Sequence, residues 1–264
     1  MIDKEGVLHG QCILNTRPAH QQAGLKAWLE AQGAAVIAFP VIEIVDCEVR
    51  AIHLGLAQQI GHYDIALFVS RNAVDGAFRF LQAEKLPTDL QLGVIGEATR
   101  QALNERVSDL DRRLIRSHPY NSEGLLSSSA LQQVQGKNIL IFRGQEGRNL
   151  LGDELSARGA TVSFCEVYHR MIPDYEASYF DRLSAQCFPT LGVFTSNEGM
   201  YNALSLITGK SRDKLLEIPW LLISERMRET AIELGHNESI IIATNASDEG
   251  IQQAISEWAG EQAD

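Results

Sequence analysis

The sequence predicts an α/β protein built from two doubly wound domains, each with a parallel sheet covered by helices. Three observations lead to this prediction: short apolar runs alternate with segments of helical period, the alternation occurs twice at a constant offset, and polar turns follow the apolar runs. A length of 264 residues suits two such domains. The composition, with 45% apolar and 22% charged residues, is that of an ordinary soluble protein.

The clearest unit runs from Ile139 to Arg170. The apolar run Ile139–Phe142 predicts a buried strand, and Arg143–Gly144 predicts a turn after it. The segment Leu150–Gly159 has leucines on one helical face and a glycine where the helix should end. Val162–Tyr168 then predicts a second strand.

The same unit occurs near the start of the chain, from Ile13 to Ile44. Arg17 matches Arg143 and Gly33 matches Gly159, at one offset in both cases (143 − 17 = 126 and 159 − 33 = 126). A constant offset over a whole supersecondary unit indicates two copies of one module.

The repeat continues beyond these units. Asp64–Leu81 matches Thr190–Ile207 at the same offset, and Asn121–Leu126 matches Ser247–Gln252. Between them the offset rises by two (224 − 96 = 128), which we attribute to an insertion in a predicted loop at Gly209–Leu215. The duplication therefore covers nearly the whole chain.

The turns that follow the predicted strands are the candidate ligand site, because parallel sheets bind ligands beyond the carboxyl ends of their strands. Serines at positions such as Ser70 and Ser196 suit helix N-caps. The alternative is anion capture by several helix N-termini that point into one cleft. Capping is the better interpretation of any single turn. For six such turns, together with Arg17 and Arg143, we favour an anion-binding cleft between the domains.

Charge and motifs exclude several classes of function. The formal net charge of −11 argues against a duplex nucleic-acid partner, and an anionic ligand would need local donors. The four cysteines lack metal spacing and suit reduced thiols, and the seven histidines form no ligand pair, so we expect no metal site. The first ten residues show no secretory signal, and no apolar stretch is long enough to span a bilayer.

Short motifs in the order of the chain resemble the uroporphyrinogen-III synthase family over essentially the full length. They are Thr16-Arg17-Pro18, Phe68-Val69-Ser70-Arg71-Asn72-Ala73, Val94-Ile95-Gly96 with Thr99, Ser122-Glu123-Gly124-Leu125, Arg143-Gly144, Tyr168 and Phe194-Thr195-Ser196. The resemblance implies flavodoxin-like domains that exchange parts. One domain would hold residues 1–38 and 172–264, the other 46–164, with 39–45 and 165–171 as two linker strands. The alternative is two sequential domains that meet near Gln135-Gly136.

The resemblance also implies an activity, that of a lyase of porphyrin, tetrapyrrole and haem biosynthesis. Such an enzyme cyclises hydroxymethylbilane, a linear tetrapyrrole rich in carboxylates, with loss of water and inversion of ring D, to give uroporphyrinogen III. No cofactor and no metal is implied. We expect a cytoplasmic monomer without nucleic-acid or membrane partners, which takes its substrate from solution or from the preceding pathway enzyme.

Tyr168 is the candidate catalytic residue that the resemblance implies, and the first copy of the repeat has Ile42 in its place. Its phenol would hydrogen-bond the departing hydroxyl or act as a weak general acid; the alternative is a packed strand tyrosine. Arg17 and Arg143 would pair with substrate carboxylates or with nearby acidic side chains. The candidate substrate-binding residues are Arg17, Ser70, Asn72, Gly96, Thr99, Ser122, Gly124, Arg143, Gly144, Thr195, Ser196, Asn197 and Ser224. The family's Gly-x-x-Thr, present at Gly96 and Thr99, is lost at Ser224–Met227.

Two other classes of function remain open from the residues alone. One is a two-lobed α/β module that binds a polyanionic small molecule without catalysis, like solute receptors that need an export signal. The other is a nucleotide-sugar transferase, which the chain length and the lack of nucleotide motifs disfavour.

Overall fold

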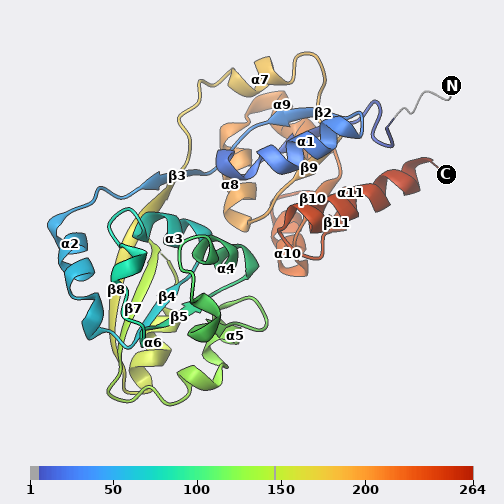
Figure 1. The fold of residues 1–264 in the computed structure, drawn as a ribbon. Helices are drawn as coiled ribbons and strands as arrows, with labels where there is room; N and C mark the ends of the chain where they lie inside the picture. The colour runs from blue at the N-terminus through green and yellow to red at the C-terminus, as the bar shows by residue number, and fades with distance from the viewer. Residues whose placement is uncertain (1–5, 146, 264) are drawn as a thin grey trace. The chain divides into compact units, whose positions relative to one another are not determined.

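The chain is described by a computed structural model that covers residues 6–145 and 147–263. It divides into two compact units (Figure 1): unit 1 holds the described residues up to Glu43 and those from Met171 onward, and unit 2 holds Ile44–Arg170. The first five residues, which enter the prediction of a missing secretory signal, lie outside the described range. In the described part of the chain, every helix is too short or too polar to cross a bilayer.

Unit 1 contains a five-stranded parallel sheet with the order β11-β10-β9-β1-β2. Its strands are β1 (Cys12–Asn15), β2 (Ala35–Ala38), β9 (Leu191–Val193), β10 (Trp220–Leu222) and β11 (Ile240–Ile242). Its helices are η1 (Ala19–Gln21), α1 (Ala23–Ala31), α7 (Tyr179–Leu183), α8 (Asn197–Leu206), α9 (Gly209–Leu216), α10 (Glu225–Glu233) and α11 (Asp248–Ala263).

Unit 2 contains a six-stranded sheet with the order β3-β8-β7-β4-β5-β6, and the pairings from β8 to β6 are parallel. Its strands are β3 (Glu43–Asp46), β4 (Ile65–Phe68), β5 (Gln91–Val94), β6 (Leu114–Arg116), β7 (Asn138–Gly144) and β8 (Thr161–Met171). Its helices are α2 (Ala51–Gln58), η2 (Ile60–His62), α3 (Arg71–Ala77), η3 (Ala83–Lys85), α4 (Glu97–Asn104), η4 (Leu110–Arg112), α5 (Ser122–Leu126), η5 (Ser129–Leu131) and α6 (Leu150–Ala157).

Each sheet combines strands from both copies of the sequence repeat. In unit 1, β1 and β2 of the first copy pair with β9, β10 and β11 of the second. In unit 2, β7 and β8 of the second copy pair with β4, β5 and β6 of the first. If the strands of one copy are numbered 1 to 5, both sheets contain the order 2-1-3-4-5, which is the flavodoxin-like doubly wound order. In unit 2, β3 is an additional edge strand beside β8. The predicted fold class is confirmed.

Strand alternation places an apolar layer on both faces of the sheet in unit 2, and helices cover both layers (Figure 1). Phe68 and Phe142 point to the face covered by α3 and α4, and their rings stack with centroids 4.8 Å apart. Leu67 and Ile141, one residue away in each strand, point to the face covered by α5 and α6. The sheet that carries the candidate residues is therefore packed on both faces.

Two local predictions are wrong. Arg143 and Gly144 do not form a turn; they belong to β7, because the long strand β8 continues past them and offers backbone partners up to Tyr168. The predicted loop at Gly209–Leu215 is the helix α9, so the two extra residues of the second copy lie in or next to a helix.

Candidate functional site

Tyr168, Ser70 and Gly144 form one cluster near the carboxyl ends of β4 and β7. The phenol oxygen of Tyr168 and the hydroxyl oxygen of Ser70 are hydrogen-bonded at 3.1 Å. A bulge between Arg143 and Gly144 shifts the register so that Gly144 lies opposite Tyr168. The tyrosine ring then fills the space above the glycine, where an added Cβ would come within 2.7 Å of Cε2. Only glycine at residue 144 leaves room for this ring position.

Tyr168 is 4% exposed and belongs to the apolar core of unit 2. Its packing is thus that of a buried strand tyrosine, while its hydroxyl reaches Ser70, which is half-buried. Burying a phenol is favourable only when its hydroxyl has a hydrogen-bond partner. Ser70 supplies that partner and is the more exposed member of the pair.

Serine capping occurs at the predicted helix starts. Ser70 accepts a hydrogen bond from the amide of Ala73 at 3.1 Å and caps α3, and Ser196 accepts one from the amide of Gly199 at 3.0 Å and caps α8. Ser224 does the same for α10, with the amide of Met227 at 3.3 Å. Each cap contributes about 1 kcal/mol, so these serines have a structural role whatever else they bind.

Two further caps were missed in the sequence. The side chain of Asn121 accepts from the amide of Gly124 at 2.7 Å and caps α5, and Ser247 caps α11 through Gly250 at 3.2 Å. Asn121 and Ser247 occupy equivalent positions in the repeat (247 − 121 = 126). Both caps could have been predicted from this shared offset and from the preference of Asn and Ser for N-cap positions.

Several candidate groups are already engaged in local hydrogen bonds. The amide of Gly124 is held by its cap, and a Cβ there would lie within 2.0 Å of the carbonyl oxygen of Pro119. The hydroxyl of Thr99, which is 2% exposed, donates to the carbonyl of Ile95 at 2.7 Å. Gly96 is the N-cap of α4 and has a φ of 85°, a conformation that favours glycine. Three of the remaining candidates lie at or just before helix starts and are half-buried: Asn72, Ser122 and Thr195.

Arg143 is 8% exposed and held on several sides. Its guanidinium donates to the side chain of Asn149 at 2.8 Å and to the carboxylate of Glu166 at 3.4 Å, and it lies over the ring of Phe164 at 4.5 Å. Its Nε atom is buried without a hydrogen-bond partner among the described residues. The arginine is thus held on three sides, by Asn149, Glu166 and Phe164.

Arg17, the equivalent residue of the first copy, has a similar environment in unit 1. It is 7% exposed, and one terminal nitrogen donates to Asp248 at 2.5 Å. Asp248 lies in the first turn of α11, where a carboxylate is also stabilised by the helix dipole. The Nε atom of Arg17 likewise has no partner in the described part of the chain. Both arginines therefore pair with a neighbouring carboxylate. From the sequence, this pairing was expected as the alternative to binding substrate carboxylates.

The other unit 1 candidates lie at the carboxyl ends of the neighbouring strands. Thr195 and Ser196 follow β9, and the side-chain amide of Asn197 donates to the hydroxyl of Thr230 at 2.9 Å. This bond joins α8 to α10. Because these strands are parallel, the residues lie at the same edge of the sheet as Arg17.

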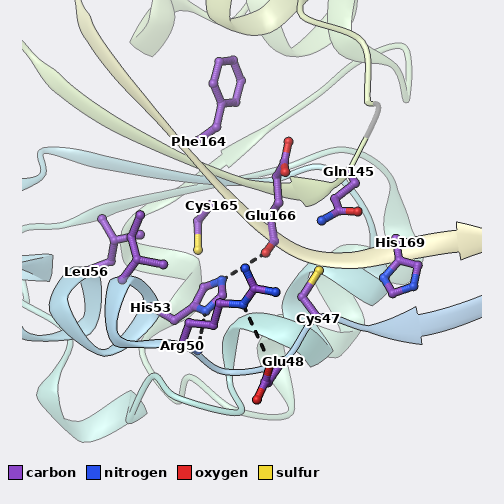
Figure 2. Close-up of a pocket in the computed structure, with 11 residues that line it drawn as sticks. Cys47, Glu48, Arg50, His53, Leu56, Gln145, Phe164, Cys165, Glu166 and His169 are labelled. Atoms are coloured by element: carbon purple, nitrogen blue, oxygen red, sulfur yellow. Dashed lines mark hydrogen bonds and ion pairs between the residues drawn. The ribbon is translucent and has the colours of Figure 1, made fainter.

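A cavity of about 330 Å³ lies elsewhere in unit 2, between the β3–α2 connection and β8 (Figure 2). In Figure 2, His53 lies against β8: its Nε2 is 3.2 Å from the carbonyl of Glu166, and its Nδ1 accepts from the amide of Arg50 at 2.9 Å. The described lining residues include none of the predicted site residues. Glu166 links the two regions, because its carboxylate also pairs with Arg143.

Fold and site together define a class: a doubly wound α/β protein of two units, with capped helices, buried arginines and a hydrogen-bonded tyrosine at strand ends. A family model described as uroporphyrinogen-III synthase HemD matches residues 23–253. The chain belongs to the uroporphyrinogen-III synthase family.

Relatives agree with this assignment, and solved structures share the fold. The chain is 35% identical over 250 residues to a uroporphyrinogen-III synthase of Salmonella typhimurium, covering 92% of this chain and 99% of the relative. It is 34% identical over 251 residues to that of Escherichia coli, with the same coverage. A mutant uroporphyrinogen III synthase from Thermus thermophilus has the same fold, with a TM-score of 0.63, 16% identity and coverage of 94% of this chain and 100% of the other. A uroporphyrinogen-III synthetase from Helicobacter pylori also has this fold, with a TM-score of 0.57 and 14% identity. The match covers 94% of this chain and 99% of the other.

Proposed function

We propose that this chain is a uroporphyrinogen-III synthase, a lyase of haem and tetrapyrrole biosynthesis. It would cyclise hydroxymethylbilane with loss of water and inversion of ring D. The observation that carries the proposal is the similarity to enzymes of this name over 92% of this chain and 99% of theirs. Similarity to relatives that are named as enzymes over nearly their whole length favours catalysis over a non-catalytic binding module.

The reaction places modest demands on acid–base chemistry, because the pyrrole nitrogens of the substrate expel the hydroxyl themselves. The protein has to hold a flexible polyanion in the shape that closes with ring inversion, which is a task of positioning and electrostatics. Charged donors such as Arg17 and Arg143 would supply carboxylate contacts. Each is held by a carboxylate, Arg17 by Asp248 and Arg143 by Glu166, so substrate binding would have a substrate carboxylate replace or join that partner.

Tyr168 would assist the departure of the hydroxyl, with Ser70 as its hydrogen-bond partner. The 3.1 Å contact between the two hydroxyls supports this assignment, because it fixes the phenol and leaves the half-buried serine oxygen nearer to a substrate. Gly144 would act by leaving space for the tyrosine ring. Seven other strand-end candidates would contribute amides and hydroxyls: Asn72, Gly96, Ser122, Thr195, Ser196, Asn197 and Ser224. The last two candidates, Thr99 and Gly124, would hold the strand-end turns in place, because their hydroxyl and amide are already hydrogen-bonded within unit 2.

The finer details of the assignment are also part of the proposal. The enzyme would act in the cytoplasm as a monomer and take its substrate from solution or from the preceding pathway enzyme. Residues 39–45 and 165–171 would serve as the linker strands between a domain of residues 1–38 and 172–264 and a domain of residues 46–164.

The test is to incubate the purified chain with hydroxymethylbilane and to separate the I and III isomers of the oxidised product. Unassisted closure gives isomer I, so the proposal predicts that isomer III dominates in proportion to enzyme added. Heat-denatured protein is the control. A product that contains only isomer I, from a chain that still binds the substrate, would instead establish a non-catalytic binding module.

A further inference from the structure

Two cysteines that are far apart in the sequence meet in unit 1. The sulfur atoms of Cys12 and Cys187 are 2.6 Å apart, although 175 positions separate the residues in the chain. Both are free thiols in the structure. A small shift of either side chain brings such a pair to bonding distance, and pairs that start far apart do not achieve this without backbone movement.

The backbone around the pair is held in register by Thr190. Its amide donates to the carbonyl of Cys12 at 2.7 Å, and its hydroxyl accepts from the amide of Cys12 at 3.0 Å. The same hydroxyl is 2.6 Å from the side-chain oxygen of Gln11. These bonds fix the loop that carries Cys187 against the start of β1, so the two thiols remain together while unit 1 is folded.

The two thiols differ in access. Cys12 is 2% exposed, and burial together with the neighbouring Cys187 raises its pKa to about 12. Cys187 is half-buried in the loop before β9. A reagent in solution therefore meets Cys187 first, and Cys12 is placed to complete the reaction from inside.

We propose that Cys12 and Cys187 form a reversible disulfide, a redox modification site of unit 1 that is independent of the synthase reaction. With oxidised glutathione, the thiolate of Cys187 attacks one sulfur, forms a mixed disulfide and releases one glutathione thiolate. The sulfur of Cys12, after loss of its proton, attacks the sulfur of Cys187 and releases the second glutathione. The two cysteines are oxidised, one glutathione disulfide is reduced to two thiols, and the two cysteine protons end on those thiols.

The position of the bond gives it a specific consequence. Because unit 2 spans Ile44–Arg170, the covalent loop from residue 12 to residue 187 encloses both crossings of the chain and the whole of unit 2. A single cut anywhere within unit 2 would then leave the two fragments covalently joined. Cys12 begins β1, at the opposite end of the strand from Arg17, so the bond does not involve the candidate site.

The experiment treats the reduced full-length chain with oxidised glutathione, alkylates the remaining thiols, and maps peptides by mass spectrometry without reduction. Cys187→Ser is the test variant, since replacing the buried Cys12 risks the fold. Cys47→Ser is the matched control, because Cys47 is a half-buried thiol in unit 2. The wild type and Cys47→Ser should lose two hydrogen atoms, give one linked peptide pair containing Cys12 and Cys187, and keep their fragments joined on a non-reducing gel after nicking in unit 2.

Cys187→Ser should show none of these three signs. Dithiothreitol should restore free thiols in the oxidised wild type. The proposal is overturned if Cys12 and Cys187 are both alkylated after treatment, if glutathione stays attached to Cys187, or if the linked peptides contain Cys47 and Cys165 instead. Isomer III formation by the reduced wild type tests the proposed function separately, and its outcome has no bearing on the disulfide.

Discussion

Replacing Gly144 with alanine should displace the tyrosine that we place at the centre of the reaction. An alanine Cβ at this position would lie 2.7 Å from Cε2, 2.8 Å from Cζ and 3.2 Å from the hydroxyl oxygen of Tyr168. Ordinary contacts begin at 3.4 Å, so the ring must retreat by about 0.7 Å (3.4 − 2.7 = 0.7). Residue 144 lies outside the left-handed backbone region, so the effect comes from the ring and not from backbone strain.

The magnitude follows from two contributions. Overpacking a filled core costs about 1–3 kcal/mol, and losing the Ser70–Tyr168 hydrogen bond costs about 0.5–1.5 kcal/mol more. The free energy of unfolding should therefore fall by about 1.5–4.5 kcal/mol. A misplacement of about 1 Å at a reacting group costs about a hundredfold in rate. We expect Gly144→Ala to form isomer III about ten to a hundred times more slowly.

The assay compares initial rates of isomer III formation and urea unfolding for Gly144→Ala and Gly55→Ala. Gly55 lies in α2 with open space around an added Cβ. Its replacement should keep the wild-type rate and stabilise the helix by about 0.5–1 kcal/mol. If folded Gly144→Ala turns over at the wild-type rate, the position of the Tyr168 ring does not matter for the reaction.

Three further predictions concern charge and hydrogen bonding. Tyr168→Phe should slow isomer III formation while the thermal midpoint changes little, because only one hydrogen bond of about 0.5–1.5 kcal/mol is lost; an unchanged rate removes the phenol from the mechanism. Substrate binding should weaken as salt is raised, because charge-assisted contacts are screened; a dissociation constant indifferent to ionic strength contradicts carboxylate capture. Burial lowers the pKa of His236, which stacks on Trp220 with centroids 4.3 Å apart. The unfolded chain therefore binds this proton more readily, and stability is lost as the pH falls below about 6.5. The urea midpoint of the wild type should fall across this pH range. His236→Phe should make the fall smaller, and the control His62→Gln, at an exposed residue, should leave it unchanged.

The sequence alone determined the elements and their pairing into two copies. Local patterns carry this information: an apolar run of four predicts a buried strand, and a leucine face that ends in glycine predicts a helix such as α6. The N-caps at Ser70 and Ser196 are also local, because a cap bonds an amide three residues ahead. Repetition at one offset then gave the same module twice.

The local sequence pattern did not predict which residues the candidate site residues contact. The sequence predicted a turn at Arg143–Gly144. These residues instead extend β7, because β8 is long enough to pair with them, and that length is known only from the strand pairing in the structure. Arg17 reaches Asp248 across 231 positions of the chain, and Ser70 reaches Tyr168 across 98. No periodicity of a few residues encodes contacts of that range.

The strand order of the two sheets also depends on contacts between residues that are far apart in the sequence. A repeat read along the chain is compatible with sequential domains and with exchanged ones, because each copy has the same strands in either case. Hydrogen bonding between strands decided it: β1 pairs with β9 of the other copy, and β7 pairs with β4. What the sequence determined is set by neighbours within one turn or one strand, and what the tertiary structure decided is which distant segments bury their surfaces against each other.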